Sequence, residues 1–147
     1  MTPLTSLDEL SPGQEFDLGR FSLPLEEVLD FARRYDPQPF HLDVEAARAS
    51  IFGGLVASGL HTLSATIGHL LRSGLISGIN LAGGGIQLSW PAALPPDTEV
   101  TFRLIVEEVR PSRSKPGMGI AKLRYRLARV DNGVVVLDGV GIHFMKR

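Results

Sequence analysis

The sequence of 147 residues contains no cysteine. Disulfide bonds, thiolate nucleophiles and cysteine-ligated metals are therefore excluded, although the redox compartment stays open. An excess of charge of one sign is also missing, because 15 Lys and Arg residues are balanced by 16 Asp and Glu residues. A general attraction to nucleic acid or to a membrane surface is therefore not expected. The N-terminus has neither a basic start nor an apolar run of signal-peptide length, so we expect a cytoplasmic protein.

Charged residues are almost absent from one long internal stretch. Between Ala49 and Pro96, Arg72 is the only Asp, Glu, Lys or Arg. Residues 49–71 are about long enough to cross a bilayer as a helix. This stretch nevertheless includes two histidines, several hydroxyl side chains and four glycines, so it is only moderately apolar. We therefore predict a helix buried inside a soluble protein and no membrane span.

Hydrophobic periodicity divides the chain into a helical half and a strand-rich half. Helical spacing of apolar residues is found over residues 22–35, 43–50 and 57–72. Alternation predicts strands over residues 14–23, 80–90, 98–109, 120–130 and 134–145. With 44% hydrophobic residues, the chain suits a single domain, residues 1–147, with a sizeable core. The order of elements predicts an α+β fold with a buried helix against one face of an antiparallel sheet.

The predicted helices have recognisable ends. Ser22, Asp43 and Ser58 are the expected N-caps, because a short polar side chain can accept the first free N–H groups of a helix. Gly74 is the expected stop of the longest helix. One wide apolar stripe along that helix is formed by Val56, Leu60, Leu63, Ile67 and Leu71. We expect the helix to be buried through this stripe.

The segment DPQPFHLD holds an acid and an imidazole, Asp36 and His41, five residues apart, and two prolines stiffen the link between them. A carboxylate and an imidazole can divide general acid and base roles if burial and mutual charge move their pKa values. Alternatively, Asp36 ends a helix and His41 fills a turn. The spacing alone is not specific and leaves both interpretations open.

A longer stretch around this pair decides between them. The segment FARRYDPQPFHLDVEAARASIFGGLVASGLHTLS closely resembles the (R)-specific enoyl-CoA hydratases, also called MaoC-like dehydratases. The motif of that family, Asp-x-Asn-Pro-x-His-x-Asp, reads DPQPFHLD over residues 36–43. The strand-rich half, notably SRSKPG at 112–117, is also similar to the family. The resemblance covers residues 20–145, nearly the whole chain.

The resemblance implies a hot-dog fold, in which an antiparallel sheet wraps around one long central helix, usually in a dimer. It implies that Asp36 and His41 hold a catalytic water and share proton transfer at Cα and Cβ of an enoyl thioester. Gly59 occupies the family's position for a backbone N–H that stabilises the enolate oxygen, as helix N-termini do. Close helix packing is a second and compatible role for Gly59.

Further substrate contacts are implied by the same resemblance. Gln38 stands where the family often has Asn and is expected to position substrate through its amide. Phe52 lies within the matching stretch and is expected to line the site. Ser58 replaces the histidine that many members have before the glycine, with an unknown effect on the acyl pocket or on catalysis. Ser64 is a further candidate, although bonding of its hydroxyl to its own helix is the stronger expectation.

Coenzyme A carries phosphates, which favour cations at the rim of the site. Arg113 and Lys115 in SRSKPG are the candidates, donated within one chain or across a dimer, with a solvated loop as the alternative. His61 and His69 are expected to be packed or surface histidines, and His143 is expected to be structural. No metal-ligand spacing is present, so we predict no metal and no cofactor other than the coenzyme A of the substrate.

These observations lead to one main hypothesis and two alternatives. The main hypothesis is an enzyme that reversibly hydrates a 2-enoyl-CoA to an (R)-3-hydroxyacyl-CoA. The alternatives are thioester hydrolysis on the same fold and a non-catalytic acyl-thioester-binding subunit. The long uncharged stretch also predicts a subunit contact, hence a homodimer or a dimer of dimers, with residues 79–90 as the joining strand.

Overall fold

The computed structural model describes residues 1–147 and contains one antiparallel sheet of five strands. The strand order is β1-β3-β4-β5-β2, and every neighbouring pair is antiparallel. The strands are β1 Glu15–Phe21, β2 Asn80–Ser89, β3 Val100–Pro111, β4 Met118–Arg129 and β5 Val135–Lys146. The predicted strands are thus all present, with ends shifted by one or two residues.

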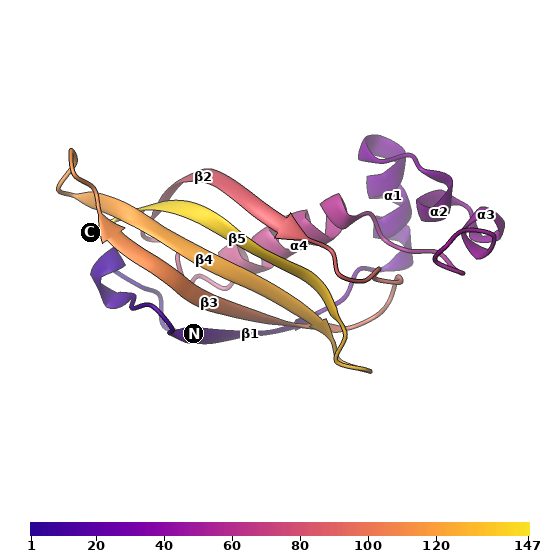
Figure 1. The fold of residues 1–147 in the computed structure, drawn as a ribbon, viewed down its shortest axis with the longest axis horizontal. Helices are drawn as coiled ribbons and strands as arrows, with labels where there is room; N and C mark the ends of the chain where they lie inside the picture. The colour runs from indigo at the N-terminus through magenta and orange to yellow at the C-terminus, as the bar shows by residue number, and fades with distance from the viewer.

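The helices lie on one side of this sheet and beyond one of its ends. They are η1 Leu7–Glu9, α1 Leu25–Tyr35, α2 Pro39–Leu42, α3 Val44–Arg48 and α4 Gly59–Arg72. Figure 1 shows α4 running along the sheet, with α1, α2 and α3 gathered beyond the end where α4 begins. The predicted α+β arrangement is confirmed. None of these helices is long and apolar enough to span a membrane.

The sheet buries one face and exposes the other, as the alternation predicts. The buried face includes Phe102, Leu104, Leu123, Tyr125 and Leu127, each with no more than 1% of its surface exposed. On the opposite face, Lys122, Arg124 and Arg126 form the expected polar row and pair with acidic side chains of β3 and β5.

The buried face of α4 differs from the predicted apolar stripe. Thr62 and Thr66 are buried, whereas Leu60 is 47% exposed and Leu71 42% exposed. The two threonine hydroxyls can be buried because they donate to carbonyl oxygens four residues earlier, at 3.3 and 2.7 Å. Of the predicted apolar stripe, Val56 is buried and Leu63 and Ile67 pack against the core, whereas Leu60 and Leu71 are exposed, so the stripe is buried only in part.

The helix ends follow the predicted caps except at α1. Asp43 and Ser58 accept backbone N–H groups as N-caps, and Gly74 follows α4 with φ +80°. At α1 the N-cap is Pro24 and not Ser22, and the distant Asp97 accepts the Leu25 N–H at 3.2 Å. A side chain far away in the sequence thus replaces the local cap.

Candidate active site

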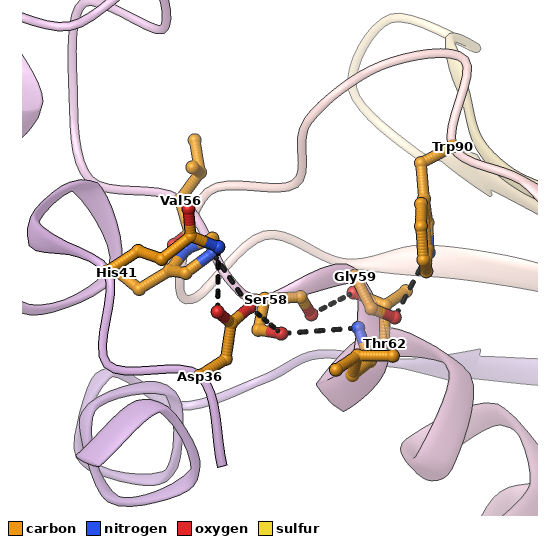
Figure 2. A network of polar contacts seen from close by, with 9 residues as sticks. Asp36, His41, Val56, Ser58, Gly59, Thr62 and Trp90 are labelled. Atoms are coloured by element: carbon orange, nitrogen blue, oxygen red, sulfur yellow. Dashed lines mark hydrogen bonds and ion pairs between the residues drawn. The ribbon is translucent and has the colours of Figure 1, made fainter.

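Asp36 and His41 are brought together by two short local elements. Asp36 caps the C-terminus of α1, and Pro37 disfavours a further helical turn at this residue. The Gln38 N–H donates back to the Asp36 carbonyl oxygen at 2.8 Å, which reverses the chain. His41 then lies in α2, a single turn that begins at Pro39. The two side chains therefore face each other, with His41 Nε2 3.2 Å from Asp36 Oδ2 (Figure 2).

The His41 ring is fixed by the backbone. Its Nδ1 lies 2.7 Å from the Val56 carbonyl oxygen, which can only accept, so Nδ1 carries a proton. In the neutral ring Nε2 is then the basic nitrogen, and it points at Asp36. A proton on Nε2 completes a hydrogen bond to the carboxylate. The arrangement places an acid and a base within hydrogen-bond distance of each other.

Asp36 is held ionised by its neighbours. Oδ2 accepts from the Ser58 hydroxyl at 2.7 Å, and Oδ1 accepts from the Gln38 amide at 2.7 Å. Burial acts to raise the pKa of Asp36, but the hydrogen bonds from Ser58 and Gln38 and the charge of His41 outweigh it, so the pKa lies below its ordinary value. A carboxylate with this environment remains charged at neutral pH.

Ser58 links the acid to the start of α4. It is 1% exposed, and its Oγ donates to Asp36 while accepting the Leu60 N–H at 3.2 Å. Figure 2 shows it between Asp36 and Gly59. Ser58 does not line the cavity described below, so its predicted role as a substrate contact is corrected to that of a partner of Asp36.

Gly59 occupies the first position of α4, where the helix itself offers no acceptor for the backbone N–H. The Trp90 indole lies directly against it, and Nε1 donates to the Gly59 carbonyl oxygen at 3.0 Å. A Cβ at position 59 would overlap the indole ring. Close packing therefore accounts for the glycine, and its N–H remains a free donor at the positive end of the helix dipole.

These residues surround one cavity of about 550 Å³, of whose 16 lining residues 10 are hydrophobic. Five of the predicted site residues line it: Asp36, Gln38, His41, Phe52 and Gly59. The cavity therefore has a small polar end at the acid–imidazole pair and a mostly apolar body. Such a cavity suits a ligand with an apolar chain and one polar reactive group.

Three other predicted site residues lie elsewhere. Ser64 is exposed, and its hydroxyl donates to the Leu60 carbonyl oxygen at 2.9 Å, so the expectation of a hydroxyl bonded to its own helix is confirmed and the cavity role is not. Arg113 and Lys115 lie in the β3–β4 loop, at the opposite end of the sheet from α2 (Figure 1). Within one chain they do not belong to this site, because the length of the sheet separates them from it.

The remaining histidines are packed, as predicted. His61 stacks on Phe31 with ring centroids 4.7 Å apart, and the His69 Nε2–H donates to the Leu18 carbonyl oxygen at 2.6 Å. The buried His143 ring is hydrogen-bonded to the Tyr125 hydroxyl and to the Asn80 side chain. No group of three or more His, Asp or Glu side chains lies close enough together to hold a metal ion.

Sequence reasoning missed two residues that shape the site. Val56 fixes the His41 tautomer through a backbone oxygen, which no side-chain pattern reveals. Trp90 covers Gly59 from the end of β2. As the only tryptophan and the last residue of the strand predicted over 80–90, it was a visible signal that could have suggested a wall of the cavity.

Comparison with known proteins agrees with this geometry. Residues 9–124 match the MaoC like domain family. The chain belongs to the MaoC-like domain family. It is similar to the MaoC-like dehydratase from Rhodospirillum rubrum, whose crystal structure shares 38% identity and a TM-score of 0.88, with 97% of each chain covered. This similarity confirms the hot-dog fold.

Two further relatives of this MaoC-like chain extend the comparison. The (R)-hydratase from A. caviae involved in PHA biosynthesis shares 27% identity, with a TM-score of 0.72 over 91% of this chain and 96% of that one. The uncharacterized protein YdeM of Bacillus subtilis (strain 168) is 28% identical over 113 residues, 76% of this chain and 80% of that protein. Family membership and these neighbours support a hydratase or dehydratase activity.

Proposed function

We propose that the chain, acting as one MaoC-like domain, reversibly hydrates a 2-enoyl-CoA to an (R)-3-hydroxyacyl-CoA. The observation that supports this most is the 3.2 Å contact between His41 Nε2 and Asp36 Oδ2 at the polar end of an apolar cavity. No metal or further cofactor enters the proposal. Coenzyme A takes part only as a portion of the substrate.

The acid–imidazole pair supplies both proton transfers. In the hydration direction, a water held by Asp36 and His41 on the cavity side loses a proton to the pair while its oxygen bonds to Cβ. The pair returns one proton to Cα, so that water adds across the double bond and the thioester stays intact. Because both groups reach the substrate from one side, hydroxyl and proton add to the same face. Dehydration is the reverse sequence.

Charge develops on the thioester oxygen as the enolate forms. The Gly59 N–H, free at the first position of α4, is the proposed donor to that oxygen, aided by the helix dipole. Gln38 and Phe52 line the same cavity and are proposed to position the substrate. Gln38 also donates to Asp36, so its amide orients the acid as well.

The test is an ultraviolet assay of enoyl-CoA consumption across chain lengths, with free thiol measured in parallel. We expect loss of the enoyl chromophore without thiol release. Asp36→Asn should lower kcat/KM by about 10²–10⁴-fold, as removal of an acid–base group commonly does. Asp30→Asn, an exposed change on α1, is the matched control and should retain full activity. Thiol release would indicate a thioesterase, and binding without turnover a non-catalytic subunit.

We also propose that the chain forms a homodimer through β2. One edge of β2 is unpaired, and residues 80–90 contain no charged side chain to protect it. The exposed apolar residues Leu60, Leu71, Leu81 and Ile86 lie on α4 and β2 beside this edge. Sedimentation should show a dimer at micromolar concentration. Leu81→Lys should shift it to monomer, and a monomeric unaltered chain would contradict the proposal.

Such a dimer explains the position of Arg113 and Lys115. Antiparallel pairing of two β2 strands reverses the direction of the partner sheet. The β3–β4 loop of the second copy then lies at the same end as Asp36 of the first. We propose that these cations bind the phosphates of coenzyme A across the dimer. An Arg113→Ala/Lys115→Ala double variant should raise KM for enoyl-CoA with little change in kcat, as loss of uniform binding does.

A further inference from the structure

Trp90 is the only tryptophan of the chain and comes directly after β2, which ends at Ser89. Its indole lies against the start of α4, where Nε1 donates to the Gly59 carbonyl oxygen at 3.0 Å. A Cβ at position 59 would overlap the ring, so the ring and the Gly59 backbone are in direct contact. Trp90 also lines the cavity that contains Asp36. The indole is therefore a wall of this cavity, and its single polar atom is already bonded.

The wall is tied to α4 at a second point. The Ala57 N–H donates to the Leu94 carbonyl oxygen at 2.8 Å, and residues 90–94 all line the cavity. No residue of this segment is charged. Both ties lie within a single chain, so the contact between the indole and Gly59 does not depend on whether the free edge of β2 pairs with a second copy.

Gly59 lies between the acid–imidazole pair and the indole. Figure 2 shows Asp36 and His41 on one side of Gly59 and Trp90 on the other. The hydrogen bonds agree with this order, because Ser58 donates to Asp36 at 2.7 Å whereas Gly59, the next residue, accepts from Trp90. A ligand centred at the Gly59 N–H thus has the pair on one side and the indole on the other.

The atoms of the proposed substrate follow a matching order. The thioester carbon carries the oxygen, Cα and the sulfur. When the oxygen accepts from the Gly59 N–H, Cα and Cβ must lie on the side of Asp36 and His41, because these carbons receive the proton and the hydroxyl. The sulfur then points to the other side of Gly59, which is the side of Trp90.

The indole suits this part of the substrate. Because its N–H is bonded to the Gly59 carbonyl oxygen, the ring offers the cavity only apolar, polarisable surface. Contacts between sulfur and an aromatic ring are stabilising, and so is the burial of methylene groups against such a surface. Trp90 has no free donor for a phosphate, a role proposed for Arg113 and Lys115 instead.

We propose, building on the proposed hydratase function, that Trp90 is a substrate-binding residue that holds the thioester sulfur and the adjoining methylene groups of coenzyme A. The acyl chain continues from Cβ, on the far side of the carbonyl group from the sulfur. The contribution of Trp90 to binding is therefore independent of acyl length, and it is also independent of the phosphates of the coenzyme.

The test compares crotonyl-CoA with crotonyl-N-acetylcysteamine, which keeps the sulfur and the adjoining methylene groups but has no phosphate. Trp90→Leu should raise KM about two- to tenfold, by the same factor for both substrates and with little change in kcat, as loss of a sulfur–aromatic contact allows. The factor should be the same for an octenoyl chain on either carrier. Trp90→Phe keeps an aromatic ring and should recover most of the affinity. Arg113→Ala/Lys115→Ala should raise KM for crotonyl-CoA alone.

Three results would overturn the proposal. A lower kcat with unchanged KM would mean that Trp90 acts only through the Gly59 donor. An effect that grows with acyl length would place the indole beside the acyl chain. A rise in KM for crotonyl-CoA but not for crotonyl-N-acetylcysteamine would mean that the indole contacts a more distant part of the coenzyme. Thermal unfolding identifies a variant that fails to fold, and Trp90→Ile then replaces it.

Because Trp90 is the only tryptophan, its fluorescence gives a second readout that needs no turnover. Titration of the full-length protein with butyryl-N-acetylcysteamine, a saturated thioester, should change the emission saturably, with the same final amplitude for an octanoyl chain. A response without hydration of any enoyl thioester would refute the proposed function and leave this inference standing. Hydration of crotonyl-N-acetylcysteamine with no response to its saturated analogue at saturation would refute this inference alone.

Discussion

His41 and His143 are two buried histidines that are held in nearly the same way. They are 5% and 7% exposed. In each ring Nδ1 donates to a fixed oxygen, the Val56 carbonyl at 2.7 Å in one case and the Asn80 amide at 2.9 Å in the other. In each ring Nε2 is consequently the nitrogen that meets the functional partner. The backbone and the core thus leave Nε2 as the hydrogen-bond acceptor of each neutral imidazole.

His41 and His143 differ in the group that lies at Nε2. His41 faces the Asp36 carboxylate, which is ionised, whereas His143 faces the buried Tyr125 hydroxyl. Burial lowers the pKa of His143 to about 4, and nothing charged opposes it. His143 therefore takes up no proton near neutral pH. His41 Nε2 instead lies beside the carboxylate of a second acid–base group. The same local geometry lies beside the proposed catalytic acid in one region and within the core in the other.

The largest expected effect comes from removing each imidazole in turn. His41→Ala should lower kcat/KM for crotonyl-CoA by about 10²–10⁴-fold, because an acid–base group is lost. His143→Phe should leave this rate within a few fold, because its buried ring takes up no proton near neutral pH and does not line the cavity around Asp36. Steady-state assays at matched protein concentration measure both. Equal losses in the two variants would remove the distinction between the regions.

The pH dependence of the free energy of unfolding should reveal the burial of His143. His143 has a folded pKa of about 4 against an ordinary value of 6.5, so the unfolded chain binds the extra proton between these limits. Its contribution to the free energy of unfolding should therefore be full above pH 6.5 and fall by about 3 kcal/mol as the pH drops to about 4. His143→Phe should flatten this part of the curve. Denaturant titrations at several pH values would measure it, and an unchanged slope would contradict a neutral buried His143.

Gly59 offers a way to separate packing from catalysis at the active site. Gly59→Ala should destabilise the protein by about 1–3 kcal/mol, because its Cβ overlaps Trp90. In a Trp90→Leu background the same change should cost much less, whereas the backbone N–H is present in every variant. Thermal unfolding of the unaltered chain, the two single variants and the double variant gives the coupling free energy between positions 59 and 90. A cost that is independent of Trp90 would mean that something other than the indole requires the glycine.

The smallest expected effect concerns the support of Asp36 by Ser58. The Ser58 hydroxyl helps to keep the Asp36 pKa low, so Ser58→Ala should raise that pKa toward its ordinary value. Activity that needs the carboxylate is lost as the pH falls through this pKa, so the acid limb of kcat/KM should move to higher pH. The rate at neutral pH should fall by about tenfold, as loss of one charge-assisted hydrogen bond allows. Ser58→Thr keeps a hydroxyl and should restore the profile, whereas an unmoved acid limb would argue against this role.

Much of the fold was predictable because periodicity and turn residues are local signals. The five strands, the caps at Asp43 and Ser58 and the end of α4 at Gly74 were all read from neighbouring residues. The start of α1 was not, because its first N–H is accepted by Asp97, 72 residues away. The burial of Thr62 and Thr66 on α4 was also missed, because threonines bonded to their own helix look polar in sequence.

The candidate site shows the same limit. The motif placed Asp36, Gln38 and His41 together, and the cavity contains all three. Their orientation depends on Val56 and Trp90, which approach from other segments, and no spacing rule indicates such contacts. Arg113 and Lys115 were predicted from a motif alone. Only the sheet topology reveals that they lie at the end of the sheet opposite to Asp36.

The most direct test of the shared acid–imidazole pair is the stereochemistry of hydration. Crotonyl-CoA should be hydrated in deuterium oxide, and the product analysed for configuration and for the position of deuterium. One pair acting from one side predicts a single deuterium at Cα on the face that received the hydroxyl, and the proposed (R)-hydratase activity predicts (R)-3-hydroxybutyryl-CoA as the product. Addition to opposite faces, or an (S) product, would contradict the account.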